Sequence, residues 1–560
     1  MARRHMAPAR RAILARCAAL LATWACLLAA PCQADLHVRY VVAPVPPSNQ
    51  SPAITHVRME VTGAVPGERL AVQMPRWAPG DYHIQDFAQY VRNMSAHAVG
   101  GAPVEIRRAD ADTWQFSAPS GTVVLTYDLP NEPPGIFCEN VVVQEDFAFY
   151  NGPALYLYLV GHKNEACTLS IDFPSGWNRA LVPLPEDKEH SGVYSAPDYD
   201  TLADSPLLVG KFLTRDFQAA GRPHTAAFFR DVSGMNVDAF IPILRRIVEE
   251  ENRLMGGPPY ERYVFFFDVD GPGGGLEHLN SCRIAWPREA PLRVMAAMAA
   301  HEFFHLWNVK RIRPNVLGPF DYINPPRTPA LWFCEGVTSY YGNLSLCRAG
   351  IITQGAYLAG LARSIAALQR NPARKRITAE EASLRVWDSD NSSGYGGLSY
   401  YLKGELMGLC LDLRIRQASR GQRSLDDVMR YLYAHYAIPK PGYTPQQLRS
   451  AIVEVGGPEL GPFYDRLVAT TEELPYNECL AAVGLRVTED ELGSWVLAPL
   501  EGADPVAQRR RLEWLSSQGP RSGNGGGAPS VTTMERRADA LSPICTSLAG
   551  MKEIGARGRS

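Results

Sequence analysis

The stretch A-A-H-E-F-F-H-L-W, residues 299–307, contains the pattern H-E-x-x-H. It lies in a run at 293–309 that is rich in Ala, Met, Leu and Phe, which favour an α-helix. Side chains four residues apart lie on one face of a helix, so His301 and His305 are expected to bind one zinc ion together. Glu302 can then act on a water at the metal without being a ligand. The alternative is a helix with two histidines in the core.

Catalytic zinc needs a third protein ligand and an open position for water. Few histidines follow the helix, but a carboxylate is present at Glu335, within L-W-F-C-E-G-V-T-S-Y-Y, residues 331–341. Its neighbours are apolar, which favours a side chain directed inward over a solvated one. We therefore predict one zinc ion held by His301, His305 and Glu335.

The chemistry of such a site needs further groups. Glu302 is expected to act as the general base. The negative charge that develops in the reaction needs a donor, and S-Y-Y-L-K-G, residues 399–404, offers a phenol at the start of a predicted helix. Glu277 follows a Gly-rich stretch at 271–275, where a carboxylate in a cleft can bind the α-ammonium group of a peptide. Otherwise it is a strand-end residue satisfied by local contacts.

Length and composition are those of a globular protein. The 560 residues are enough for about three domains. The formal net charge is −2 and 46% of the residues are hydrophobic. This balance indicates neither a nucleic-acid partner nor an acidic substrate.

The N-terminus has the pattern of a secretory signal peptide. Arginines at 3–16 precede an apolar run at 17–30 and P-C-Q-A at 31–34, and we expect cleavage after Ala34. A membrane anchor is the alternative, but the run is shorter than the about 20 residues that a spanning helix needs. We expect export to the periplasm or the cell exterior, with no stable membrane span after the signal is removed.

Eleven cysteines are present, three of them in the predicted signal peptide. The others are scattered without a C-x-x-C pair, which argues against a cysteine zinc site and a dense disulfide framework. Export permits an occasional disulfide. Cys138 with Cys167 is one candidate pair, and buried free thiols are equally compatible with the sequence.

The remaining patterns predict β structure first and helices later. Apolar residues alternate with period two in short runs such as 36–41, 57–61 and 123–127, which indicates a β-sandwich-like domain. The segment 74–82, M-P-R-W-A-P-G-D-Y, is interpreted as a turn with core aromatics. Further on we predict a strand at 263–269 and helices at 238–254, 402–416 and 425–436. Strands at 485–487 and 495–497 could begin a small β domain, whereas the composition after Glu501 favours disorder.

Several ordered motifs resemble those of gluzincin peptidases. H-E-x-x-H, W-x-x-E-G and Y-x-K-G resemble the M1 aminopeptidases. The closer resemblance is to peptidase family M61, the glycyl aminopeptidases, through P-x-W-x-P-G-x-Y at 75–82, G-G-L-E-H at 274–278, E-G-x-T-x-Y-Y at 335–341 and S-Y-Y-x-K-G at 399–404. It extends over about residues 35–480. It implies a zinc aminopeptidase that favours N-terminal Gly or Ala, with Tyr401 as the oxyanion donor. Tyr400 is the alternative, because a shift of one residue at a helix start is easily made.

The resemblance also implies an α+β multidomain fold with a β-rich N-terminal domain, a thermolysin-like zinc peptidase domain, a helical subdomain and a C-terminal PDZ domain. A PDZ domain needs about 90 residues, and the chain after Glu501 supplies no recognisable strands, so a partial or degenerate PDZ is expected. The expected division is a signal peptide at 1–34, a β-rich domain at 35–215, a catalytic domain at 216–345, a helical domain completing the active site at 346–476, a PDZ remnant at 477–505 and a disordered tail at 506–560.

The expected substrate is therefore a peptide or protein N-terminus. The alternatives are a zinc endopeptidase, a gluzincin hydrolase that cleaves another kind of bond, and a binding protein that kept the fold without catalysis. His301, Glu302, His305 and Glu335 are all present, which argues against the last. No sequence feature specifies an oligomeric state.

Overall fold

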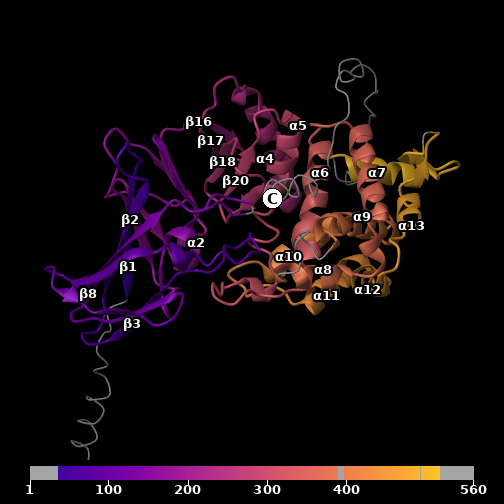
Figure 1. The fold of residues 1–560 in the computed structure, drawn as a ribbon. Coiled ribbons are helices and arrows are strands. Elements are labelled where there is room, and N and C mark those ends of the chain that lie inside the picture. Colours follow the sequence, from indigo (N-terminus) through magenta and orange to yellow (C-terminus); the bar gives the residue numbers. More distant parts are fainter. Residues whose placement is uncertain (1–35, 136, 389–396, 492, 518–560) are drawn as a thin grey trace, which may run out of the picture.

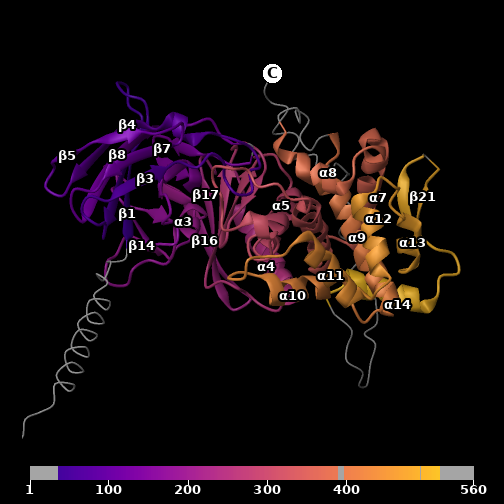
Figure 2. The same ribbon diagram turned by 90° about the horizontal axis from the view of Figure 1, so that it is seen from below.

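The computed structural model describes residues 36–135, 137–388, 397–491 and 493–517. Three parts follow one another in space, with the β-rich part on the left, a helix-flanked sheet in the middle and a helical part on the right (Figures 1 and 2). The α+β multidomain prediction is confirmed at this level. The predicted signal peptide at 1–34 and the last part of the chain lie outside the described residues.

The N-terminal part contains three sheets around one hydrophobic core. The largest has seven strands in the order β14-β12-β1-β2-β8-β4-β5, and two others have the orders β13-β15-β10-β9 and β11-β3-β7-β6. Along the long strands, residues facing the core alternate with partly exposed ones, as the period-two pattern predicted. The strands are β1 (His37–Val45), β2 (Ile54–Thr62), β3 (Arg69–Gln73), β4 (Arg92–Ala98), β5 (Pro103–Val104), β6 (Ile106–Arg108), β7 (Thr113–Ser117), β8 (Thr122–Pro130), β9 (Val141–Val143), β10 (Phe147–Tyr150), β11 (Tyr158–Leu159), β12 (Cys167–Ile171), β13 (Ala180–Leu181), β14 (Val193–Ala196) and β15 (Leu207–Gly210).

The central part is a five-stranded mixed sheet in the order β16-β17-β18-β20-β19. Its strands are β16 (Leu213–Ala219), β17 (Arg222–Phe229), β18 (Tyr263–Val269), β19 (Gly275–Glu277) and β20 (Ser281–Trp286). The strand predicted at 263–269 is confirmed as β18. All seven residues of β18 are buried, as in a strand covered on both faces. The sheet has β16 at one edge and β19 at the other, and Glu277 lies on the edge strand β19.

Two helices pack beside this sheet, α4 (Ile241–Met255) and α5 (Leu292–Phe304). The helix predicted to reach residue 309 ends at Phe304, and His305 is its C-terminal cap. Beyond it the chain turns, because the buried amide of Asn308 donates hydrogen bonds to the carbonyls of Phe333 and Cys334. These bonds tie the end of α5 to the segment that carries Glu335.

The C-terminal half is mainly helical, and the predicted helices at 402–416 and 425–436 are confirmed. Its central helix α9 is buried along most of its length. The helices are η4 (Trp332–Val337, a π-helix), α6 (Thr338–Arg348), α7 (Gln354–Arg370), α8 (Ala379–Leu384), α9 (Tyr400–Ala418), α10 (Leu425–Tyr436), α11 (Pro445–Gly456), α12 (Leu460–Ala469) and α13 (Tyr476–Ala481).

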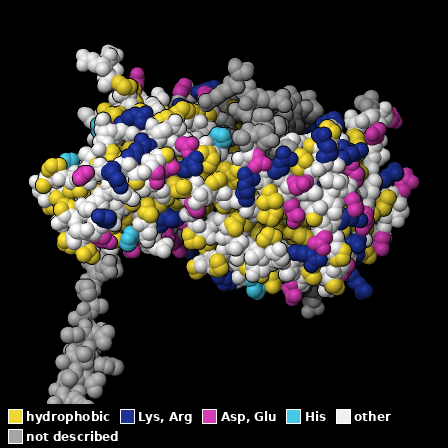
Figure 3. Space-filling view, turned by 60° about the horizontal axis from the view of Figure 1, so that its bottom comes forward, with side chains coloured by type: hydrophobic (Ala, Val, Ile, Leu, Met, Phe, Trp, Pro, Cys, Tyr) yellow, Lys and Arg dark blue, Asp and Glu magenta, His cyan; other side chains and the backbone are white. Residues whose placement is uncertain are grey.

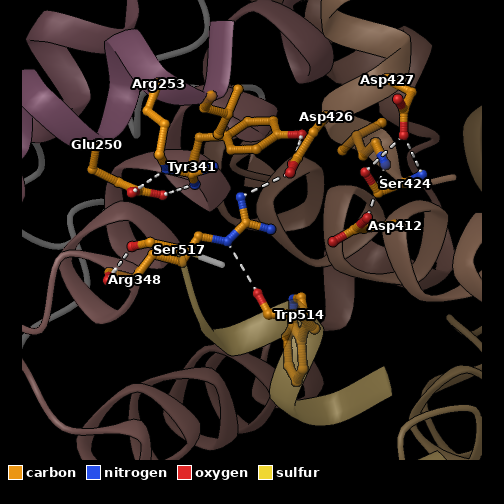
Figure 4. Close-up of polar contacts among 12 residues, drawn as sticks. Glu250, Arg253, Tyr341, Arg348, Asp412, Ser424, Asp426, Asp427, Trp514 and Ser517 are labelled. Carbon is orange, nitrogen blue, oxygen red and sulfur yellow. Dashed lines mark hydrogen bonds and ion pairs between the residues drawn. The ribbon is translucent and has the colours of Figure 1, made fainter. Parts of the chain in front are cut away.

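The end of the described chain differs from the prediction. The strands β21 (Leu485–Glu489) and β22 (Trp495–Pro499) pair only with each other among the described residues, so a PDZ-like domain is not found there. The prediction of disorder from residue 506 is wrong for the helix α14 (Pro505–Leu515). The composition after Glu501, rich in Arg, Gly, Ser and Pro, suggested disorder, but this helix is docked through the buried side chains of Trp514 and Leu515. The Trp514 indole donates to the Tyr340 hydroxyl at 2.8 Å. The Trp514 carbonyl accepts from Arg348 Nε at 3.0 Å (Figure 4).

Other expectations concern thiols, membrane and charge. The described cysteines are all buried free thiols, so the pairing of Cys138 with Cys167 is wrong. None of the helices within the described ranges is long and apolar enough to cross a membrane. On the face in Figure 3, basic and acidic side chains are interspersed, as the near-zero net charge suggested.

Replacing Trp514 by Ala is expected to release α14, because the indole also packs edge-on against Tyr357. Loss of a buried tryptophan costs about 3–5 kcal/mol, so opening of the helix should increase at least about a hundredfold. Trypsin cleavage at the arginines 509–511 measures that opening. Leu512→Ala is the control, because Leu512 is 58% exposed on the same helix. Equal cleavage rates in the two variants would contradict docking through Trp514.

Candidate active site

The structure brings the three predicted metal ligands together in the interior. His301 and His305 come from the end of α5, and Glu335 comes from η4. The two Nε2 atoms lie 3.0 Å apart, and Glu335 Oε2 lies 3.5 Å from His301 Nε2 and 3.2 Å from His305 Nε2. Ligands of a tetrahedral zinc with bonds of about 2.0–2.1 Å lie about 3.4 Å apart. The donor set and its spacing therefore fit one zinc ion.

The far side of each imidazole has its own partner. His305 Nδ1 lies 2.7 Å from the carbonyl oxygen of Asn308, to which it can donate, and His301 Nδ1 lies 3.3 Å from Ser339 Oγ. A hydrogen bond from Nδ1 fixes the ring and leaves Nε2 with a free electron pair for a metal. The turn that ends α5 at His305 supplies the first of these contacts.

The charge around the imidazoles favours a cation. Burial alone would lower the pKa of His305, but the carboxylates of Glu335, Glu277 and Glu302 oppose it and raise the pKa to about 9. Proton binding at His305 is strengthened because negative charge surrounds it. The same charge favours a divalent cation between the donors.

The π-helical turn η4 sets the position of Glu335. Turns of this type widen a helix by one residue and occur often at functional sites. Here η4 crosses α9 so closely that a Cβ on Gly336 would lie 2.3 Å from the Cα of Gly404. Only glycine permits this approach, which brings the start of α9 next to the imidazoles.

The start of α9 carries the two tyrosines considered as oxyanion donors. The ring of Tyr401 lies 6.1 Å from that of His301 at an interplanar angle of 29°, and the ring of Tyr400 stacks on Tyr401 at 4.9 Å. Both are buried. Tyr401 is thus in ring contact with a predicted ligand.

Glu302 and Glu277 meet at the same cluster. A carboxylate oxygen of each and a ring nitrogen of His305 all lie within 4.8 Å of one another. The Glu302 carboxylate packs against the edge strand β19, where a Cβ on Gly275 would lie 2.4 Å from Glu302 Oε1. A glycine at this position is required by the glutamate, which the Gly-rich pattern alone did not reveal.

The sequence did not predict that the N-terminal part reaches this site. Glu277 lies in a small pocket whose walls come from the segment 77–82, from β19 and from the chain after α5. A Cβ on Gly80 would lie 2.7 and 2.8 Å from the two carboxylate oxygens of Glu277, and Gly80 has a φ of +91°. The lining residues are Trp77, Pro79, Gly80, Tyr82, Glu277, Val309, Lys310, Leu317 and Phe320.

Tyr82 is the second unexpected member of the site. Burial, followed by the charges of Glu335 and Glu277, raises its pKa well above the ordinary range. Its ring packs edge-on against Trp387 at 5.8 Å, and Trp387 packs edge-on against Trp77 at 5.3 Å. The clustering of two aromatics, two prolines and a glycine at 75–82 was the available signal, but it is equally typical of a turn.

This arrangement is typical of metallopeptidases. Two imidazoles at the end of one helix and the carboxylate of Glu335 can hold a metal, and the carboxylate of Glu302 lies beside them. The model of the peptidase M61 N-terminal domain matches residues 44–211, and that of the M61 glycyl aminopeptidase matches residues 294–407, together about half of the chain. The protein belongs to peptidase family M61.

Among solved structures, the chain is similar to an aminopeptidase N family protein from Idiomarina loihiensis, with 24% identity and a TM-score of 0.75 over 81% of this chain and 79% of that one. This likeness shows a shared fold. A two-domain M1 zinc metallopeptidase mutant bound to L-tryptophan aligns with 14% identity and a TM-score of 0.47, over 79% of this chain and 96% of that one. No curated protein matched the chain.

Replacing His305 by Ala should abolish stoichiometric zinc binding, because it removes one of three donors from the cluster. Elemental analysis of the purified variant measures bound zinc directly. Glu302→Gln is the matched control, since it changes a neighbouring group that is not in the predicted ligand set and should retain the metal. One zinc per chain in the His305 variant would overturn the ligand assignment.

Proposed function

We propose that the protein is an exported zinc aminopeptidase that removes Gly or Ala from the N-termini of peptides. The observation that carries the proposal is the environment of Glu277. Its side chain is buried, yet within the described part of the chain no group donates a hydrogen bond to its carboxylate or pairs with it. A buried carboxylate without a partner is costly, and the α-ammonium group of a substrate would supply one.

The position of Glu277 relative to the zinc ligands supports exopeptidase action. Its carboxylate lies in the same cluster as His305, so an ammonium bound there would set the first peptide bond beside the metal site. Gly80 and Tyr82 wall the pocket around Glu277. A substrate that continued upstream of its first residue would meet this wall.

The walls also support the preference for a small first residue. Trp77 and Phe320 are bulky, and Gly80 already lies against the Glu277 carboxylate. Little space remains for a large side chain beside the bound ammonium group. Gly and Ala are therefore the side chains that this pocket fits best.

The residues of the cluster suggest how hydrolysis proceeds. Zinc, when bound, lowers the pKa of a water and polarises the scissile carbonyl. Glu302 would accept the proton of the attacking water and later donate it to the leaving amine. Tyr401 would donate a hydrogen bond to the developing oxyanion, with Tyr400 as the alternative beside it. Export rests on the signal-peptide pattern at 1–34.

The Glu302→Gln variant should lose turnover by several orders of magnitude while it keeps zinc, because an amide cannot accept the proton. The measurement is kcat with an aminoacyl reporter amide such as alanine p-nitroanilide, beside the zinc content of the same sample. A kcat within about tenfold of the wild type would show that Glu302 is not the base.

N-acetylated substrates should be cleaved far more slowly than the same peptides with a free amine. The Glu277→Gln variant keeps the shape of the side chain but loses its charge, and a charge-assisted pair is worth about 1.5–3 kcal/mol. We expect KM for free-amine substrates to rise at least tenfold and KM for acetylated substrates to change little. The difference in kcat/KM between the two kinds of substrate should therefore become smaller.

The acetylated substrate is the internal control, because it has no ammonium group to lose. If the wild type cleaves blocked and free peptides equally well, the protein is an endopeptidase instead. Failure to cleave either peptide, with zinc bound, would favour a hydrolase that acts on another bond.

A further inference from the structure

A buried carboxylate from the N-terminal part, that of Asp204, contacts the residues that follow Glu277 in the chain. Asp204 follows the short helix α3 (Tyr199–Ala203) and is 8% exposed. Its Oδ1 lies 2.8 Å from the Nζ of Lys310 and 3.1 Å from the Nδ1 of His278. Its Oδ2 accepts a hydrogen bond from the backbone N–H of Leu279 at 2.8 Å.

Two of these contacts hold the residues directly after Glu277. His278 and Leu279 continue the chain from the edge strand β19, and both are fixed to the same carboxylate. The direction of the Glu277 side chain is thereby tied to the N-terminal part.

The third contact concerns charge. Lys310 lines the same small pocket as Glu277 and is the one cationic residue among the lining residues, so it is the candidate to neutralise that carboxylate. Instead, the ammonium pairs with Asp204 and lies 5.6 Å from the centre of the Phe320 ring. Lys310 and Glu277 form no ion pair.

The ionisation of Asp204 agrees with this arrangement. Burial alone would raise its pKa, but the charges and hydrogen bonds of Lys310 and His278 outweigh burial and lower the pKa below the usual value. Asp204 is therefore an anion at neutral pH and can hold the ammonium group of Lys310 permanently.

We propose that Asp204 is a positioning residue that holds Lys310 away from Glu277, which leaves Glu277 free to bind the α-ammonium group of the substrate. The inference rests on the proposed role of Glu277 in substrate binding. On this proposal the ion pair between Asp204 and Lys310, which lies outside the metal cluster, controls the affinity of the protein for free N-termini.

Asp204→Asn tests the proposal, because the amide keeps the shape of the side chain but loses the charge that holds Lys310. The released ammonium group would then pair with Glu277 and compete with the substrate. We expect KM for alanine p-nitroanilide to rise about tenfold, with kcat changed much less. The inhibition constant of glycinamide, which carries the ammonium group but is not a reporter, should rise by the same factor.

The decisive variant is Asp204→Asn combined with Lys310→Met. Removal of the lysine leaves Glu277 without a competitor, so KM and the glycinamide inhibition constant should return to within about threefold of the wild type. A merely structural role of Asp204 predicts no such recovery. If Asp204→Asn does not fold, the double variant carries the test alone, and a tenfold higher KM in it would overturn the proposal.

Asp412→Asn is the matched control for burying an amide in place of an aspartate. Asp412 is fully buried and accepts from Tyr340 Oη at 2.6 Å, Arg416 Nε at 3.1 Å and a backbone N–H, but it does not line the pocket. The KM of the Asp412→Asn variant should equal that of the wild type.

Equal cleavage of free and acetylated peptides by the wild type would refute the proposed function. A wild type that discriminates, beside an Asp204→Asn variant with unchanged KM, would refute this inference alone.

Discussion

Negative charge buried beside two imidazoles is the constraint on which the structure depends. The carboxylates of Glu277, Glu302 and Glu335 surround His305 in the interior. Each buried carboxylate costs several kcal/mol unless a positive charge balances it. A divalent cation between the donors and, as proposed, a substrate ammonium group at Glu277 would together meet that requirement. Metal binding and the proposed substrate binding would thus both balance the same buried negative charge.

The fold delivers the members of this cluster from separate elements. The fully buried strand β18 forms the middle of the sheet, and the edge strand β19 presents Glu277. The contact between Gly336 and Gly404 lets η4 and α9 approach within backbone distance. Three hydrophobic clusters support these elements, and one of them joins β18 and β19 to the N-terminal strands β10 and β15. The segment 77–82 belongs to the N-terminal part although it lines the pocket of the central one.

Much of this could be predicted because it depends on local pattern. The spacing of His301 and His305 follows from the period of one helix, and the long strands and helices follow from hydrophobic alternation. The end of α5 was predicted too late, because it is set by hydrogen bonds of Asn308 to residues about 25 positions away. The roles of Gly80, Tyr82 and Asp204 were not predictable for the same reason, since each acts across the junction of two parts. The helix α14 was missed because the sequence after Glu501 is rich in Arg, Gly, Ser and Pro, whereas the helix is fixed by contacts of Trp514 to residues more than 160 positions earlier in the chain.

The wall formed by residues 77–82 has a consequence for the order of events during synthesis. The pocket wall is translated early, the metal donors come from 301–335 and the tyrosines only at 400–401. A nascent chain that ends before Tyr401 lacks part of this candidate site, so peptidase activity is expected only once the start of α9 has been synthesised and has folded against the metal donors.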